Sequence, residues 1–261
     1  MREVVIVSGA RTPVGRFGGS FKDVSAPDLG STAIKSALER SGISADMVDE
    51  VVIGNAVQAA EAGYAARLSS LKSGIPEETP TIAINRQCSS GLEAINIAAQ
   101  LIKTGEADIA VAGGTENMSQ VPYLIDYKAR FDGLRMGDST LRDGLTEGLG
   151  CPVNRYHMGV TAENVAERFG VSRKEQDELA YISHQRSSTA ISEGRFANQI
   201  TTVDGPQRRS DPIQVHTDEG PRSDTTIEGL SGLRPVFKKD GTVTACLLYT
   251  SPSPRDGLLS R

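Results

Sequence analysis

The chain has 261 residues, of which 28 are basic and 33 acidic, and its net charge is −5 at pH 7. This charge disfavours binding along a nucleic-acid backbone, and no apolar run approaches the length that spans a membrane. Aromatic residues make up 5% of the chain and Trp is absent, so we expect an aliphatic core, as in strands that helices cover on both faces.

The first 118 residues alternate between short apolar runs and segments with helical periodicity. The pattern predicts strands at residues 4–7, 51–53, 81–84 and 107–114, and helices at residues 33–38, 65–71 and 92–102, the first of which stops near Gly42. This order of elements predicts an α/β fold with a largely parallel sheet. The segment GARTPVGRFGGSF lacks the lysine and the full glycine spacing of a phosphate-binding loop, so we interpret it as a turn.

Cys88 lies at the junction between the third predicted strand and the helix that follows. Buried, inert cysteines are common, but Ser89, Ser90 and Gly91 are small and would let a ligand approach the backbone closely. If the helix begins here, its unsatisfied N–H groups and its dipole would stabilise a thiolate. A thiolate beside N–H donors provides the nucleophile and the oxyanion stabilisation that acyl transfer needs, so Cys88 is the candidate nucleophile.

The pattern changes after residue 118. Residues 119–232 lack the strand signals of a second α/β domain and predict a loop and helical insertion, which residues 233–245 would follow as a segment returning to the core. Within the insertion, GVTAENVAERFG predicts a short helix, and Ser172 with Glu175 forms the capping-box pattern that begins a longer one. Residues 246–261 contain Ser-Pro repeats and no core-forming pattern, so we expect a poorly ordered tail.

Five segments together resemble the thiolase family, which includes the acetyl-CoA acetyltransferases and the 3-ketoacyl-CoA thiolases. In chain order they are VVIVSGARTPVGRFGGSF, NRQCSSGLEAINIAAQLI, AVAGGTENMSQVPY, YHMGVTAENVAERFGVSRKEQDELA and LRPVFKKDGTVTA. The second resembles the nucleophile motif of the family, and the fourth resembles the insertion that covers coenzyme A. The resemblance implies the N-terminal half of a thiolase-like α/β fold, with a helical and loop insertion over the sheet–helix core.

The resemblance also implies roles for six residues. Cys88 would accept the acyl group, and its backbone N–H would contribute to an oxyanion hole. Arg222 would lie near the nucleotide end of coenzyme A and Phe237 would pack on the pantetheine arm. Coenzyme A is a substrate in this chemistry, and no cofactor or metal is implied. The residues expected to contact coenzyme A are Leu145, His157, Met158, Arg222 and Phe237.

The chemistry of the family needs catalytic groups beyond these six residues. Its cysteine attacks a 3-ketoacyl-CoA, acetyl-CoA leaves, and a second coenzyme A takes up the acyl group; the reverse reaction condenses two acetyl-CoA into acetoacetyl-CoA. A second α/β domain supplies a Gly-His-Pro motif, a second catalytic cysteine and an Asn-Glu-Ala motif, and neither tripeptide occurs in this sequence. Cys246 has no glycine-rich turn around it. We therefore expect a C-terminally truncated thiolase, inactive as given, whose residues 246–261 are out-of-frame or foreign.

Two other functions remain open. A condensing enzyme of the ketoacyl synthase type shares the fold and the nucleophile, but the segment YHMGVTAENVA favours a thiolase. A noncatalytic acyl-CoA or lipid-binding protein would keep the insertion without the chemistry, and the intact Cys-Ser-Ser sequence argues against it. Only Cys88, Cys151 and Cys246 are present, in neither a disulfide nor a zinc pattern, so we expect a cytoplasmic protein.

The resemblance implies that the full-length family member is a homodimer or homotetramer. The segment VPYLIDYKARFDGLRMGDS corresponds to the region of tetramer contacts in relatives. The same active site runs in both directions, so the sequence predicts neither a degradative nor a biosynthetic role, and it predicts no acyl-chain length.

Overall fold

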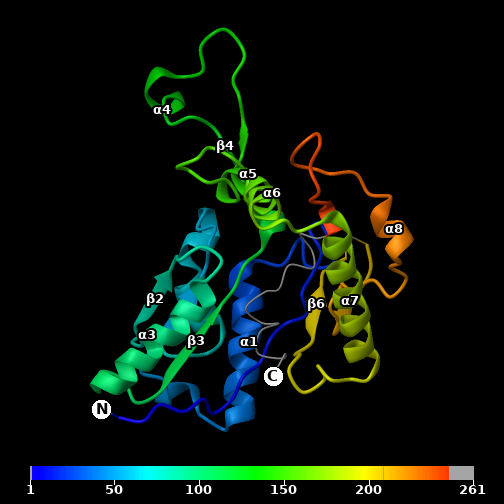
Figure 1. Ribbon diagram of the computed structural model, residues 1–261. Coiled ribbons are helices and arrows are strands. Elements are labelled where there is room, and N and C mark those ends of the chain that lie inside the picture. The colour runs from blue at the N-terminus through cyan, green and yellow to red at the C-terminus, as the bar shows by residue number, and fades with distance from the viewer. Residues whose placement is uncertain (1, 208, 247–261) are drawn as a thin grey trace. The chain divides into compact units, whose positions relative to one another are not determined.

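The computed structural model describes residues 2–207 and 209–246 (Figure 1). The chain forms two compact units: the sheet unit, Met1–Leu145 with Asn198–Glu219, and the helical unit, Thr146–Ala197 with Gly220–Arg261. Residues 119–145 and 198–219 group with the sheet in this division. The domain boundaries expected at residues 118, 232 and 245 stay predictions. Apart from Cys246, the expected tail at 246–261 lies outside the described residues.

Three parallel strands form the centre of the sheet unit, in the order β2-β1-β3. Their bounds are β1 Glu50–Gly54, β2 Thr81–Ile84 and β3 Ala110–Gly114. Val52 of the central strand pairs with Ile82 on one side and with Ala112 on the other. The predicted parallel α/β arrangement is therefore confirmed for this part of the chain.

Helices cover both faces of this sheet. Successive side chains of a strand point to opposite faces, so Val51 and Ile53 lie on one face and Val52 on the other. Val51 and Ile53 pack with side chains from α1, Ala26–Ser41, and α2, Ala65–Lys72. Val52 packs against α3, Ser90–Thr104, through Ala94 and Ala98. The sheet is thus the middle of three layers.

Local signals determine where these helices begin and end. The hydroxyl of Ser25 caps α1 by accepting the N–H of Asp28, and Pro27 stands in the first turn, where a missing N–H costs nothing. Gly42 ends the helix with a φ of 69°, the left-handed conformation that glycine adopts most readily. The expected stop near Gly42 is confirmed. Helix α3 presents Ala94, Ile97, Ala98 and Leu101 to the sheet. Leu92 and Ile95, two apolar residues of the helix predicted at 92–102, are exposed instead.

The strand predicted at residues 4–7 is wrong. This segment belongs to no ladder of the described residues, and Val5, Ile6 and Val7 are 68%, 84% and 63% exposed. β-branched residues favour an extended backbone, yet a strand also needs a neighbour that takes up its N–H and C=O groups. Residues 4–7 have the β-branched composition of a strand, but no neighbouring strand pairs with them among the described residues.

The rest of the sheet unit consists of short elements. The 3-10 turns are η1 Ala45–Met47, η2 Ala60–Tyr64 and η3 Met118–Gln120, and α4 is Ala129–Asp132. Two small antiparallel pairs are β4 Tyr123–Leu124 with β5 Arg142–Asp143, and β6 Val203–Gly205 with β7 Ile213–Val215. Helix α5, Gly144–Gly148, begins at the end of this unit. The expected loop character after residue 118 is confirmed for most of residues 119–141.

The helical unit contains α6 Met158–Phe169, α7 Arg173–Ser192 and α8 Ile227–Ser231. Helix α7 begins with the predicted capping box, since Ser172 and Glu175 each bond the backbone of the other. Within residues 2–207 and 209–246, no helix is long and apolar enough to cross a membrane.

Candidate functional site

Cys88 lies in a tight turn between the end of β2 and the start of α3. Its neighbour Gln87 has a φ of 51°, which is uncommon for a residue with a side chain and often marks a functional turn. Helix α3 begins at Ser90 with Ser89 as its N-cap, so the sulfur stands two residues before the helix rather than within it. The Cys88 residue is exposed. An exposed thiol on a constrained turn at a helix start is available to an incoming substrate.

Hydrogen bonds inside the turn hold it in this shape. The N–H groups of Ser89 and Ser90 donate to the carbonyls of Arg86 and Gln87, at 3.2 and 3.0 Å. The Ser90 hydroxyl donates to the Gln87 carbonyl at 2.6 Å and accepts the Arg86 N–H at 2.9 Å. Both serines of the Cys-Ser-Ser sequence therefore serve the geometry that presents Cys88.

The small residues after Cys88 serve packing against the sheet. A Cβ placed on Gly54, at the end of β1, would lie 2.4 Å from the carbonyl carbon of Ser90 and 2.6 Å from the nitrogen of Gly91. The first turn of α3 thus rests directly on the end of the central strand. The smallness of Ser90 and Gly91, predicted to admit a ligand, lets the helix backbone approach the strand backbone.

Polar side chains brace the same end of the sheet. Asn55 follows β1, is buried, and donates from Nδ2 to the Thr115 carbonyl at 2.8 Å and to Glu116 Oε1 at 2.9 Å. Glu116 Oε2 in turn accepts the N–H groups of Ala56 and Val57, at 2.8 and 3.2 Å. Sequence reasoning missed this pair, although a polar residue directly after a buried strand was a signal for it.

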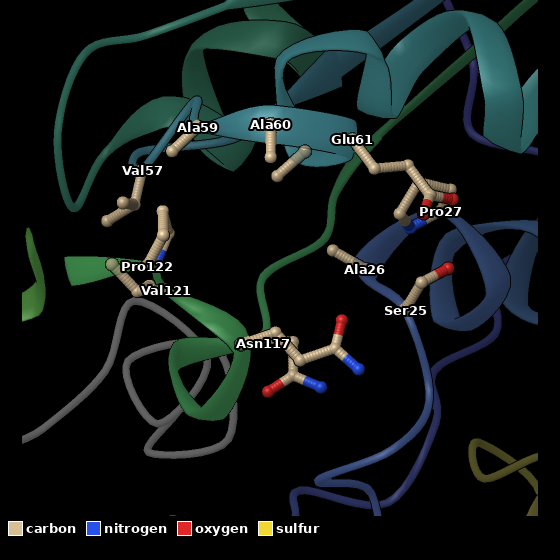
Figure 2. Close-up of a pocket in the computed structure, with 12 residues that line it drawn as sticks. Ser25, Ala26, Pro27, Val57, Ala59, Ala60, Glu61, Asn117, Val121 and Pro122 are labelled. Atoms are coloured by element: carbon tan, nitrogen blue, oxygen red, sulfur yellow. The ribbon is translucent and has the colours of Figure 1, made fainter. Parts of the chain in front are cut away.

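A cavity of about 220 Å³ opens near this end of the sheet unit (Figure 2). It is lined by the start of α1, by residues of 57–62, and by residues of 117–122. Its polar lining is already engaged: Asn117 Nδ2 donates to the carbonyls of Phe21 and Val24, at 2.8 and 2.6 Å. None of the six predicted site residues lines this cavity. Leu145, the second predicted residue in this unit, is half-buried in α5.

Three of the predicted residues meet in the helical unit. His157 is the N-cap of α6, and its Nδ1 accepts the Gly159 N–H at 3.0 Å, which places the ring proton on Nε2. The Phe237 ring stacks on this imidazole with centroids 5.1 Å apart and an interplanar angle of 14°. Met158, the first residue of α6, is 42% exposed. The arrangement offers a flat aromatic pair, a flexible thioether and a ring N–H donor.

Arg222, the remaining predicted residue, lies in a different set of contacts of the helical unit. Its backbone N–H donates to Nδ1 of His184 at 3.1 Å. His184 therefore carries its proton on Nε2, which points at the sulfur of Cys246, 3.4 Å away. His184 is only 4% exposed. His184 thus bonds the backbone of Arg222 on one side of its ring and faces Cys246 on the other, and sequence patterns had indicated no role for either His184 or Cys246.

Burial, and next the charge of Arg222, lower the pKa of His184 below its ordinary 6.5, while Asp224 acts in the opposite direction. The unfolded chain therefore takes up a proton below pH 6.5 that the folded chain resists, and stability must fall as the pH falls from 6.5 toward the lower pKa of the folded state. We expect thermal unfolding between pH 7.5 and 5.5 to show a steeper loss for the wild type than for His184→Gln. Equal pH slopes for the two proteins would contradict this expectation.

A family model described as "Thiolase, N-terminal domain" matches residues 4–248. A curated relative from Staphylococcus aureus strain COL, "Probable acetyl-CoA acyltransferase", is 48% identical over 250 residues, which are 94% of this chain and 62% of the relative. The chain thus spans about three-fifths of the length of the curated relatives it matches.

Solved structures agree with this result. The crystal structure of the Bacillus anthracis acetyl-CoA acetyltransferase matches with a TM-score of 0.88 and 39% identity, over 93% of this chain and 61% of that one. The human mitochondrial 3-ketoacyl-CoA thiolase, crystallised in complex with CoA, matches with a TM-score of 0.85 and 41% identity, over 92% and 59% of the two chains. The expected N-terminal thiolase-like fold is therefore confirmed.

Proposed function

The chain belongs to the thiolase family through its N-terminal domain, and we propose that its part in the chemistry is to accept an acyl group from coenzyme A on the sulfur of Cys88. The observation that carries this proposal is the exposed thiol on the turn between β2 and α3. In the proposed step the Cys88 thiolate attacks the thioester carbonyl, the coenzyme thiolate leaves, and an acyl thioester remains on the protein. The backbone N–H of Cys88 would stabilise the oxyanion of the intermediate.

The helical unit would supply contacts to the coenzyme. We propose that His157, Met158 and Phe237 line the path of the pantetheine arm, together with Leu145, and that Arg222 contacts the nucleotide end. Two observations support this: His157 and Phe237 are stacked, and a relative 41% identical to this chain was crystallised with CoA. A guanidinium suits a phosphate because its planar N–H groups can donate in pairs.

The activity of a whole thiolase is a further part of the proposal. Thiolysis of 3-ketoacyl-CoA, or condensation of two acetyl-CoA, would need an activating base and a proton donor that the present sequence motifs do not supply, so we propose that this chain alone does not turn over. We also propose a cytoplasmic location, which the cysteine pattern favours, and a role in fatty-acid metabolism, which the family resemblance favours. Assembly as a homodimer or homotetramer has the same basis, and exposed Tyr127, Phe131 and Met136 in the expected contact segment support it.

The test is direct transfer of an acetyl group. We expect purified chain incubated with acetyl-CoA to carry one acetyl group on the peptide that contains Cys88, detected by peptide mass mapping. Binding of coenzyme A without any acetyl-Cys88 would instead favour the noncatalytic acyl-CoA-binding alternative. Robust thiolysis of acetoacetyl-CoA by the purified chain would contradict the proposal that it does not turn over.

A further inference from the structure

We propose that Glu163 and Gly159, which the sequence resemblance assigned no role, are positioning residues that hold the Phe237 ring on His157. Glu163 fixes the base of the loop that carries Phe237, and Gly159 provides the space in which the ring lies. The effect of this positioning on coenzyme A binding rests on the proposed function, whereas the positioning itself rests on contacts within the helical unit.

Glu163 is a buried carboxylate whose hydrogen bonds go to one short segment. It lies in α6 and is 3% exposed. Its Oε1 accepts the Val243 N–H at 2.9 Å, and both its oxygens accept the Thr242 N–H, at 3.1 and 2.9 Å. The Thr242 hydroxyl adds a bond to Oε2 at 3.3 Å. A buried charge is tolerated when such donors satisfy it, and here it binds two successive backbone amides to the helix.

The clamped segment is the closing end of a loop. The N–H of Val236 donates to the Val243 carbonyl at 3.1 Å, and the Gly241 N–H donates to the Lys238 carbonyl at 3.1 Å. Gln176 of α7 also donates to the Thr242 hydroxyl, at 2.9 Å. Residues 236–243 therefore form a closed loop, and its base is held where Glu163 meets Thr242 and Val243.

Phe237 is the second residue of this closed loop, and its ring packs against Gly159. A Cβ on Gly159 would lie 2.3 Å from Cε1 and Cζ of Phe237, so the ring rests against the helix backbone. The N–H of Gly159 is also the group that holds Nδ1 of His157. One glycine thus fixes the orientation of the imidazole and leaves room for the ring that stacks on it.

The stacked pair can be observed in solution through the imidazole proton signals. The chain has three histidines, at 157, 184 and 216, so these signals can be assigned by single substitutions. A ring stacked at 5.1 Å shifts the His157 signal upfield, and Phe237→Leu defines the position without stacking. We expect Glu163→Gln to move the signal most of the way to the Phe237→Leu position, because an amide side chain has one acceptor and presents N–H groups to the donors of the loop.

Glu167→Gln is the matched control. Glu167 lies on the same helix and pairs with Lys238 of the same loop at 3.2 Å, but it is largely exposed, and exposed pairs contribute little. We expect this variant to keep the wild-type signal. A folded Glu163→Gln protein, checked by circular dichroism, whose His157 signal is unchanged would overturn the proposal.

Gly159→Ala tests the space in which the Phe237 ring lies, whereas Glu163→Gln tests the hydrogen bonds that hold the loop. Alanine favours a helix more than glycine does, so this variant should fold even if Glu163→Gln does not. Its methyl group must displace the Phe237 ring, and the His157 signal should again move toward the unstacked position. If the His157 signal does not move, the Phe237 ring does not depend on the space at Gly159 and the proposal fails.

Calorimetric titration with coenzyme A then tests the positioning role of Glu163 and Gly159 separately from the proposed function. We expect Glu163→Gln and Gly159→Ala each to weaken binding about tenfold, since they remove preorganisation rather than a ligand contact. Adding Phe237→Leu to Glu163→Gln should weaken binding no further than Phe237→Leu alone does. If the wild type binds no coenzyme A while the His157 signal responds as expected, the proposed function fails and the positioning role stands.

Discussion

Replacement of Cys88 by alanine is expected to abolish acetyl transfer from acetyl-CoA, with a fall of about 10³-fold or more in the rate of adduct formation. The loss should be this large because the sulfur is the atom that forms the new bond, and the neighbouring hydroxyls of Ser89 and Ser90 already donate to the carbonyls of the turn. The measurement is the rate at which the chain gains an acetyl group, followed by intact-protein mass spectrometry. A Cys88→Ala protein that gains the group at the wild-type rate would remove Cys88 from the chemistry.

The two other cysteines provide unequal controls. Burial raises the pKa of the Cys246 thiol, which makes it a poor competitor at neutral pH. Cys151 is the more demanding control, because backbone N–H groups of Asn154 and Val153 directed at its sulfur lower the pKa of its thiol. If acidity alone selected the acylated cysteine, Cys151→Ala would reduce transfer. We expect that variant to retain the wild-type rate, since the proposed role of Cys88 depends on its position.

Gly54→Ala is expected to destabilise the chain by about 1–3 kcal/mol, the usual cost of forcing extra volume into a packed interior. The new methyl group would meet backbone atoms of Ser90 and Gly91 at 2.4–2.6 Å, and backbone cannot rotate away as a flexible side chain can. The start of α3 must therefore move, and the turn that presents Cys88 must move with it. Urea unfolding measures the loss of stability, and the rate of Cys88 alkylation by iodoacetamide reports the displaced turn.

Gly113→Ala is the matched control for this substitution. Gly113 lies in the neighbouring strand β3 and pairs with Ile53, next to Gly54. A Cβ at Gly113 would have no described heavy atom within 4 Å. Alanine there should leave stability unchanged or raise it by a few tenths of a kcal/mol through the lower entropy of the unfolded chain. If Gly113→Ala destabilised the chain as much as Gly54→Ala does, the contact with α3 would not be the cause.

Elements with a local signal were predictable from the sequence. The apolar run at 51–53 needed only its own composition to be identified as a buried strand. The stop at Gly42 and the capping box at Ser172 are encoded within a few residues of the chain, so both could be located before the structure was known. The position of Cys88 before α3 is of the same kind, because a strand, a turn and a helical stripe follow one another there.

Features that depend on distant partners were not predictable in this way. The turn after residue 10 is held by Asp218, which pairs with Arg11 at 2.7 Å and accepts the Val14 N–H at 2.8 Å. More than 200 residues separate Asp218 from these partners, and no local pattern distinguishes it from a solvated acid. Glu163 is a similar case, since it is buried by residues 242–243, which lie about 80 positions further along the chain. The strand at 4–7 failed because pairing is a property of two segments.

The unpaired segment at residues 4–7 has a consequence for how the chain exchanges hydrogen with solvent. Its amides lie outside every described ladder, so we expect their protons to be replaced by deuterium at nearly the rate of a free peptide. The amides of Val51 and Val52 exchange only when the sheet itself opens, because strands on both sides enclose them. The same contrast predicts that a protease cuts the segment at residues 4–7 more readily than the strands at the centre of the sheet unit.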